Sequence, residues 1–200
     1  MKLNLGCAST LLEGYINIDL DSFEDIKKRY PNIKISSDTQ FLQANIFQLP
    51  FEECSIDEIR CDSLIEHLSF KEEKIFFTSM CKLLKKGGVL NISTTDFESI
   101  VKKWLLAKDD WLDFYRDDDE AIKKTHWFGT YSYDTKNRWG YLAASIYGPQ
   151  NSEGQFHKNC YTEAKLKAIY NHLGLSKVIV ERYLWKGDRD EMIRVIGIKD

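Results

Sequence analysis

The chain has 200 residues, 43% of them hydrophobic and 30% charged, so it can bury the core of one domain and is not a disordered tail. A formal net charge of -3 and a pI of about 5.9 argue against a nucleic-acid binder that relies on bulk positive charge. The five cysteines contain no C-x-x-C pair, no basic-then-apolar leader opens the chain, and no apolar run approaches the roughly 20 residues of a membrane span, so we expect reduced thiols in a soluble, cytoplasmic protein.

The first third of the chain alternates between strand-like and helix-like segments. Strands are predicted at 3–6, 15–20, 41–46 and 57–62, and a helix at 21–30 ends before Pro31. The segment between Gly6 and Tyr15 is short for a crossover connection, so we expect only a stubby helix there. This alternation predicts a parallel sheet with helices packed on its faces.

A longer helix and a fifth strand follow. Ser69 and Glu72 have the S-x-x-E spacing of a capping box, which predicts a helix that runs through Lys86. Gly87 and Gly88 are expected to end this helix, and a strand is predicted at 89–94.

The segment from about 104 to 156 is rich in aromatic and charged residues and has no clean period. A connection of this length is a lid, an extra core layer or a dimer surface, and the sequence leaves these alternatives open. Its acidic run at 116–120 lacks the glycine and the spacing of a calcium loop, so we interpret it as a solvated face and predict no metal site.

The chain ends with a helix and two strands. The helix is predicted to begin at the N-cap Thr162 and to stop at Gly174. "KVIVERYLW" and "EMIRVIGIK" alternate like strands across a short turn and predict an antiparallel hairpin. The predicted fold class is therefore α/β: one domain, residues 1–200, with an open, mostly parallel twisted sheet, helices on both faces, a C-terminal antiparallel hairpin and an aromatic-rich insertion.

The opening turn is suited to a ligand at the carboxyl edge of the sheet. Gly6, Cys7 and Ala8 are small enough for a ligand to approach the backbone, and Asp19 ends the second strand, where an acid can accept bonds from ribose hydroxyls. The turn is not the G-x-G-x-x-G loop that holds a pyrophosphate. A nucleoside without phosphates, such as S-adenosyl-L-methionine (SAM), would need less room.

Several motifs occur in order: "LNLGCA", "GYINID", "FLQANIFQLPF", "IDEIRCDSLIEHL", "LLKKGGVLNIST" and "HKNCYTEAKLKAIYNHLGL". Together they resemble the Rossmann-like class I SAM-dependent methyltransferases, in particular a small bacterial group that starts with an LNLGCG-like motif. The resemblance covers roughly residues 1–100 and 155–200. It implies SAM as the cofactor, with Asp19 at the ribose.

The chain departs from the family pattern at three positions. Ala8 stands at a usual glycine, where a methyl group is tolerated if the backbone keeps a negative φ. Asn45 stands where the family has the aspartate that accepts from the adenine amino group, and its carbonyl oxygen can still accept. Thr95 replaces a usual proline and forms another S/T-x-x-E pattern with Glu98, which predicts a second capping box.

The predicted cofactor contacts lie on the first turn and after the second, third and fourth strands: Gly6, Cys7, Ala8, Asp19, Asn45, Ile46, Ser63, Leu64 and Glu66. The alternatives are structural. Gly6 can be a plain turn residue, Asp19 a helix cap and Leu64 a core residue. Glu66 can pair with a neighbour.

Three residues are candidates for chemistry. His157 precedes the last helix and is a candidate general base, since an unperturbed imidazole has a pKa near 6.5. His67 and Asp96 follow the fourth and fifth strands. The alternatives are a surface-loop histidine for His157 and helix caps for the other two.

The predicted function is transfer of the SAM methyl group to an oxygen or nitrogen nucleophile of a small molecule, such as a sugar or surface-polysaccharide precursor. The alternatives are a non-catalytic SAM-binding regulator or partner and an aminopropyl-type transferase, which would need an acidic pocket beyond Glu66 and Asp96. The expected partner is a small-molecule substrate, not a nucleic acid or a membrane. A homodimer stays open.

Overall fold

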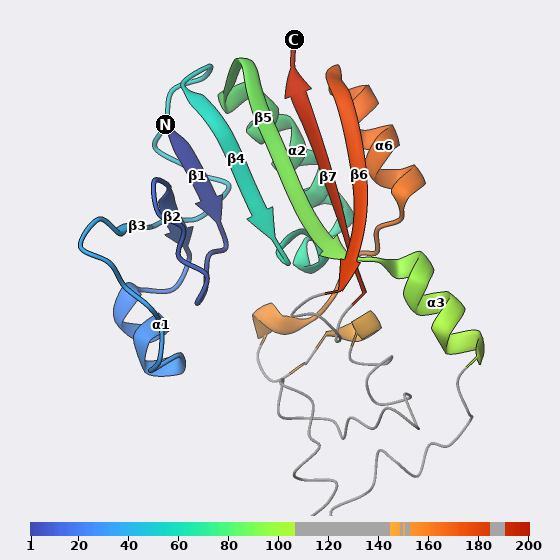
Figure 1. The fold of residues 1–200 in the computed structure, drawn as a ribbon, viewed down its shortest axis with the longest axis horizontal. Helices are drawn as coiled ribbons and strands as arrows, with labels where there is room; N and C mark the ends of the chain where they lie inside the picture. The colour runs from blue at the N-terminus through green and yellow to red at the C-terminus, as the bar shows by residue number, and fades with distance from the viewer. Residues whose placement is uncertain (107–144, 149, 151–152, 185–190) are drawn as a thin grey trace, which may run out of the picture.

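The computed structural model describes residues 1–106, 145–148, 150, 153–184 and 191–200. Its seven strands form one sheet in the order β3-β2-β1-β4-β5-β7-β6 (Figure 1). In chain order they are β1 (Lys2–Leu5), β2 (Ile16–Asp19), β3 (Gln40–Gln43), β4 (Ile56–Asp62), β5 (Leu84–Thr95), β6 (Leu175–Leu184) and β7 (Glu191–Lys199). Strands β1 to β5 pair in parallel, whereas β7 runs antiparallel to both β5 and β6. The predicted sheet and its C-terminal hairpin are confirmed.

Helices pack on both faces of this sheet. The described helices are α1 (Phe23–Arg29), α2 (Phe70–Leu83), α3 (Phe97–Leu106) and α6 (Glu163–His172), with short 3-10 turns η1 (Ile65–His67) and η3 (Glu153–Gln155). Figure 1 shows α2 and α6 on one face. On β3, Leu42 packs against the core on that side, while its neighbour Phe41 points the other way and stacks on Phe23 of α1, with ring centroids 4.9 Å apart.

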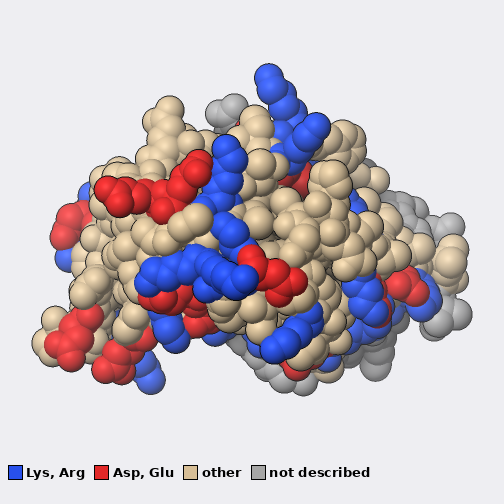
Figure 2. Space-filling view, turned by 90° about the horizontal axis from the view of Figure 1, so that it is seen from above, with Lys and Arg blue, Asp and Glu red and all other residues tan. Residues whose placement is uncertain are grey.

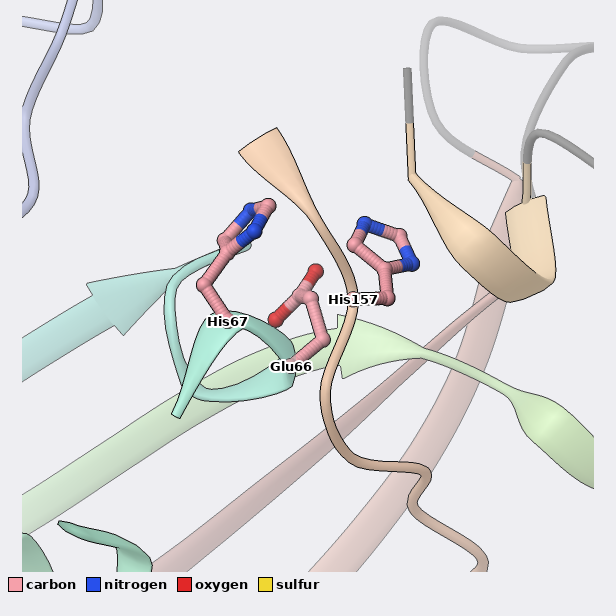
Figure 3. Close-up of side chains that lie close together, drawn as sticks. All are labelled: Glu66, His67 and His157. Carbon is pink, nitrogen blue, oxygen red and sulfur yellow. The ribbon is translucent and has the colours of Figure 1, made fainter. Parts of the chain in front are cut away.

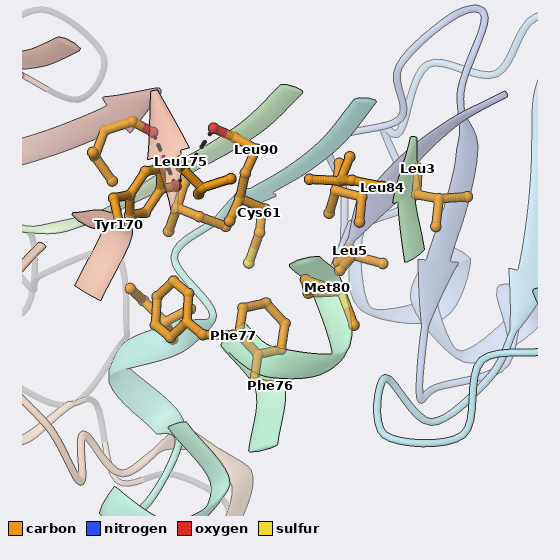
Figure 4. Packing of buried hydrophobic residues seen from close by; sticks show 14 of the residues in the cluster. Leu3, Leu5, Cys61, Phe76, Phe77, Met80, Leu84, Leu90, Tyr170 and Leu175 are labelled. Carbon is orange, nitrogen blue, oxygen red and sulfur yellow. Dashed lines mark hydrogen bonds between the residues drawn. The ribbon is translucent and has the colours of Figure 1, made fainter. Parts of the chain in front are cut away.

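The main core lies between the sheet and helices α2 and α6 (Figure 4). Phe76 and Phe77 of α2 meet Tyr170 of α6 here, and each fully buried side chain of this size stabilises the fold by about 1.5–3 kcal/mol. The Tyr170 hydroxyl lies 3.3 Å from the Val195 carbonyl oxygen, to which it donates. A Cβ at Gly197 would lie 2.7 Å from the Tyr170 ring, so glycine at this position makes room for the ring.

Helix α2 begins as predicted and ends earlier. Ser69 and Glu72 form the capping box, with both reciprocal bonds present. The predicted extension to Lys86 is wrong, because the helix ends at Leu83 and β5 begins at once. Gly87, with φ +79°, lies in an irregularity of β5 opposite Ile56, and a Cβ at Gly88 would lie 2.8 Å from the Lys85 carbonyl oxygen. The two glycines therefore serve a bulge in the strand and do not end the helix.

The connection from β1 to β2 contains turns and no helix, so the stubby helix predicted there is wrong. Two buried asparagines, Asn4 and Asn17, take its place. The Asn4 amide donates to the Thr10 carbonyl oxygen at 2.7 Å and to Asn17 Oδ1 at 2.8 Å. Asn17 exchanges two bonds with the Leu12 backbone and donates to the Gln40 carbonyl oxygen. Side-chain amides thus satisfy backbone groups that a helix would satisfy internally.

Most of the aromatic-rich insertion predicted at 104–156 lies outside the described residues, and so does the run at 116–120. The described part of the insertion includes the end of α3 and the turn η3. Among the described helices, none is long and apolar enough to cross a membrane.

Basic and acidic side chains alternate at the end of the molecule that lies at the top of Figure 1, as Figure 2 shows. Ion pairs near the amino ends of the parallel strands join Lys2 to Glu58 at 3.0 Å and Lys85 to Asp57 at 2.7 Å. The carboxyl ends of the same strands lie at the opposite edge, where the predicted site residues are found.

Candidate functional site

The turn after β1 folds tightly against the segment that follows β4. Gly6 has φ +62°, and a Cβ placed on it would lie 3.1 Å from Leu64 Cδ1, so only glycine fits both the backbone and the space. Cys7 N–H donates to the Ile18 carbonyl oxygen at 3.1 Å, which ties the turn to β2. The structure therefore places Gly6, Cys7 and Leu64 together, as the sequence predicts for one site.

Ala8 adopts φ +40°, so the negative φ under which its methyl group would be tolerated without strain is not present. The cause is the neighbouring carboxylate: Ala8 N–H donates to Asp19 Oδ2 at 2.9 Å, and this bond holds the turn in a left-handed conformation. Asp19 Oδ1 accepts from the Asp21 N–H at 3.1 Å. Each oxygen of Asp19 keeps a further lone pair, which a ribose hydroxyl could use.

Cys7 lines the same turn as a neutral thiol. Burial, and then the nearby negative charge of Asp19, raise the pKa of Cys7 to about 12. Since the thiolate is the reactive form, Cys7 is a small packing residue here and not a nucleophile.

The residues after β3 form a local turn. Asn45 Oδ1 accepts from the Phe47 N–H at 2.9 Å, and the Asn45 carbonyl oxygen accepts from the Gln48 N–H. The predicted acceptor for the adenine amino group therefore already carries one bond within its own chain segment. Ile46 packs against the edge of the hydrophobic core.

After β4 the chain bends at Ser63, which has φ +53° and whose N–H donates to the Ser93 carbonyl oxygen at 2.8 Å. The bend leads through Leu64 into η1, which carries Glu66 and His67. Glu66 is 3% exposed and its Oε2 accepts from Thr94 Oγ1 at 2.8 Å. Thr94, which the sequence analysis did not single out, thus holds the Glu66 side chain toward β5.

Two histidines predicted as catalytic candidates meet beside Glu66 (Figure 3). The rings of His67 and His157 have centroids 4.9 Å apart and an interplanar angle of 72°. One nitrogen or carboxylate oxygen from each of Glu66, His67 and His157 lies within 4.8 Å of the others. The two segments are joined by backbone bonds from Lys158 and Asn159 N–H groups to the Glu66 carbonyl oxygen.

Each imidazole is oriented by a backbone carbonyl. His157 Nδ1 donates to the Ser145 carbonyl oxygen at 2.9 Å, and His67 Nδ1 donates to that of Phe156 at 3.2 Å. A carbonyl oxygen only accepts, so both Nδ1 atoms carry the proton, and Nε2 is the nitrogen with the lone pair in the neutral rings.

Asp96 has a different environment. It is 1% exposed, and its Oδ2 accepts from Ser99 Oγ at 2.7 Å and from Arg182 Nε at 2.8 Å. The Ser99 N–H also points to Asp96 Oδ1, so Asp96 caps α3, and the capping box predicted for Thr95 and Glu98 is wrong. These bonds favour the structural alternative for Asp96.

A pocket with a volume of about 570 Å³ lies beside the first turn, between residues 9–11 and 29–34. None of the residues predicted to contact SAM lines it. Arg29, at its rim, pairs with Asp21 at 2.7 Å, and this bond raises the pKa of the guanidinium. The pocket therefore borders the proposed cofactor region without including its polar groups.

Residues 6–92 match a family described as a methyltransferase domain. A comparison with curated proteins gives no match. The matched domain supports the prediction of a SAM-dependent methyltransferase and of SAM as its cofactor, whereas the particular small bacterial group stays a prediction.

Solved structures with this fold are similar over almost the whole chain. A SAM-dependent methyltransferase of Archaeoglobus fulgidus is 12% identical with a TM-score of 0.58, over 99% of this chain and 85% of that chain. The 1,6-didemethyltoxoflavin N1-methyltransferase of Burkholderia thailandensis, solved with that substrate and S-adenosylhomocysteine, is 12% identical with a TM-score of 0.56, over 100% and 71%. A Haloferax volcanii methyltransferase, solved with the Trm112 methyltransferase activator, is 12% identical with a TM-score of 0.55, over 98% and 81%. At 12% identity, the similarity to these three structures shows that this chain shares their fold, and no more than that.

Proposed function

We propose that this chain, whose residues 6–92 match a methyltransferase domain, transfers the sulfonium methyl group of SAM to an oxygen or nitrogen nucleophile of a small molecule. The observation that carries this proposal is the turn after β1. Gly6 and Ala8 in this turn have left-handed backbones, and the Ala8 N–H donates to the Asp19 carboxylate at the carboxyl edge of the sheet, where open α/β sheets bind ligands.

The residues present fit the adenosyl part of SAM. Glycine at position 6 allows the turn to pack closely against the segment after β4, because a Cβ there would lie 3.1 Å from Leu64 Cδ1. Asp19 would accept the ribose hydroxyls, and Asn45 with the backbone of Ile46 would face the adenine. Ser63 and Leu64 would line the other side of the cofactor.

Bound SAM supplies a methyl carbon that is activated by the positive sulfur. The nucleophile's lone pair forms the new bond to this carbon while the carbon–sulfur bond breaks and its electrons stay on sulfur. The chain has to align the reactants and accept the proton of the nucleophile. We propose His157 as the residue that accepts it, because its bond to Ser145 leaves Nε2 as the basic nitrogen.

The acceptor that we propose is a hydroxyl-bearing compound such as a sugar or surface-polysaccharide precursor. A hydroxyl must lose its proton as it is methylated, and the two neighbouring imidazoles provide for this. A cytoplasmic location remains part of the proposal, whereas the homodimer stays an open alternative.

A non-catalytic SAM-binding regulator is the second candidate. It is favoured by the local bond that occupies Asn45 Oδ1 and by the alanine in the left-handed position of the turn. Such a protein would bind SAM and S-adenosylhomocysteine with similar affinity and would have no turnover with any acceptor.

Isothermal calorimetry with S-adenosylhomocysteine tests the cofactor site. Asp19→Asn keeps an oxygen for the Ala8 N–H and removes the charge, so affinity should fall by about 1–3 kcal/mol, which is roughly fivefold to 150-fold. Asp21→Asn, at an exposed ion pair with Arg29, is the matched control and should bind normally. Equal affinity in both variants, or no binding by the wild-type protein, would overturn the proposal.

A further inference from the structure

The cluster of Glu66, His67 and His157 has the composition of a metal site. Two imidazoles and one carboxylate are the ligand set of catalytic zinc sites and of non-haem iron sites, which leave further positions open. Ligand atoms around a tetrahedral zinc ion lie about 3.3 Å apart, given bond lengths near 2.0–2.1 Å. The three candidate ligand atoms here lie within 4.8 Å of one another, so small side-chain movements would bring them to the spacing of a zinc site.

The groups behind these three side chains orient them for metal binding. Metal-bound histidines usually donate their second N–H to a carbonyl or carboxylate, which fixes the tautomer. Both Nδ1 atoms here donate to backbone carbonyls, at 2.9 Å for His157 and 3.2 Å for His67. Thr94 donates to the carboxylate of Glu66, so each of the three candidate ligands has a supporting bond.

The charge of Glu66 gives an independent reason to expect a cation. This carboxylate is 3% exposed, and a buried charge is costly unless it is paired. Among the described residues, its side chain accepts a hydrogen bond from the neutral Thr94 hydroxyl. Within the residues that the structure describes, no lysine or arginine forms an ion pair with Glu66.

The backbone holds the two halves of the cluster in place although they are 90 residues apart in the chain. Lys158 and Asn159 N–H groups donate to the Glu66 carbonyl oxygen at 2.8 and 3.1 Å. The Asn159 side chain donates to Glu73 at 2.7 Å, and the buried Tyr161 hydroxyl donates to the Ile65 carbonyl oxygen at 3.2 Å. Rigid support of this kind is what a preformed metal site requires.

We propose that Glu66, His67 and His157 bind a divalent transition-metal ion, with Zn²⁺ as the best fit to this ligand set. The site is at the carboxyl edge of β4 and β5, and the ion would have coordination positions left for a water or an acceptor oxygen. Metal binding is independent of the proposed methyl transfer, but in the metal-bound protein it replaces the role of His157 as the base.

The role of the ion rests on the proposed function. A bound cation lowers the pKa of an oxygen that coordinates it, so an acceptor hydroxyl would release its proton to solvent before its oxygen forms the bond to the methyl carbon. In the metal-bound protein both imidazoles are ligands and not bases. Activity that is lost with a chelator and restored by Zn²⁺ would separate this role from proton transfer to a metal-free His157.

Titration of the metal-free, full-length protein with Co²⁺ alone tests the site, because ligand-field bands in the visible spectrum report imidazole and carboxylate coordination. We expect one Co²⁺ per chain, displaced by Zn²⁺. His157→Gln, His67→Gln and Glu66→Gln should each weaken binding at least about tenfold, since even the supporting partners of metal ligands are worth about 10–100-fold. His172→Gln, on the exposed end of α6, is the control.

Circular dichroism of each variant shows whether it is folded, and in Glu66→Gln the side-chain amide oxygen can still accept from Thr94. Absence of Co²⁺ bands in the wild-type protein, or equal binding in a folded His157→Gln variant and the control, would overturn the proposal. S-adenosylhomocysteine affinity measured on the same metal-free samples reports the cofactor site separately. Failure of the metal site therefore leaves the proposed methyl transfer intact, and the reverse also holds.

Discussion

The two left-handed residues of the first turn have different energetic consequences. Gly6 needs no Cβ, and the Leu64 side chain occupies the space where one would lie. Ala8 carries a Cβ at φ +40°, and a left-handed backbone costs an L-residue roughly 1–2 kcal/mol. The bond from its N–H to the Asp19 carboxylate offsets this strain, so the turn is held by the same side chain that is predicted to contact the ribose.

Ala8→Gly should therefore stabilise the protein. Relief of the left-handed strain outweighs the additional backbone entropy that glycine loses on folding, which leaves a net gain of about 0.5–1 kcal/mol. The midpoint of urea unfolding measures this change. Ser9→Gly at the next position, where no positive φ occurs, should destabilise or leave the protein unchanged. A lower midpoint for Ala8→Gly would contradict the assignment of strain to Ala8.

At the scale of elements, the connection between β1 and β2 depends on side-chain amides. Asn17 is fully buried on the strand and bonds to Leu12, Tyr15 and Gln40, so one side chain joins the turn to two strands. The same connection carries Gly6 and Ala8. We therefore expect the bonds of Asn17 to fix the conformation of the turn at the proposed cofactor site.

Asn17→Ala should destabilise the protein by about 2–4 kcal/mol, because it removes one partner of the buried Asn4 amide and the partners of half-buried backbone groups of Leu12 and Tyr15. Such groups cost about 1–3 kcal/mol each when they are left unsatisfied. Affinity for S-adenosylhomocysteine should fall in the folded fraction as well. Thermal unfolding and calorimetry at a temperature well below the midpoint measure the two effects. Asn171→Ala, at an exposed position of α6, is the matched control. A stable variant with normal affinity would show that the asparagine is not what shapes the turn.

Elements whose signals are local were predictable from sequence. The Ser69–Glu72 capping box and the hairpin of β6 and β7 depend on spacing and alternation within a few residues, and both predictions are confirmed. The end of α2 was not predictable, because Gly87 and Gly88 look like a helix stop and serve instead a bulge that is set by pairing with Ile56. The prediction of a helix between β1 and β2 was wrong for the same reason, since Asn4 and Asn17 act through contacts that the sequence does not show.

The candidate site was predictable only in part. Strand order places Asp19, His67 and His157 at one edge of a parallel sheet, and all three were predicted as site residues from the sequence. Glu66 was predicted at the cofactor and no metal site was predicted, since no local spacing of ligands joins residues 66 and 157, which are far apart in the chain. The convergence of Glu66 with both histidines depends on backbone bonds between η1 and residues 158–159, which are visible only in three dimensions.

At the scale of the whole molecule, burial of thiols and phenols sets how stability responds to alkaline pH. Burial raises the pKa of Cys7 to about 12, and it raises the pKa values of Cys61, Tyr161 and Tyr170 above their usual ranges. In the unfolded chain the thiols titrate near 8.5 and the phenols near 10. The unfolded chain therefore loses protons at a pH where the folded protein keeps them.

The sign follows from proton linkage. Above about pH 8.5 the folded state binds more protons than the unfolded state, so the free energy of unfolding falls as pH rises. The contribution of each buried thiol is fully present below about pH 8.5 and declines by about 2 kcal/mol up to pH 10. Urea unfolding at intervals between pH 7 and pH 10 measures the decline.

Substitution of single cysteines assigns this decline to particular groups. Cys61→Ala removes a fully buried thiol, so its stability curve should fall less steeply between pH 8.5 and 10 even if its stability at pH 7 is lower. Cys160→Ala removes an exposed thiol and should keep the wild-type slope. The slope, and not the absolute stability, is the readout, because the cavity left by Cys61→Ala shifts the whole curve by a constant amount. Parallel curves for the two variants would show that the Cys61 thiol is not protected from titration, and the packing of the core around β4 would then have to be looser than the structure shows.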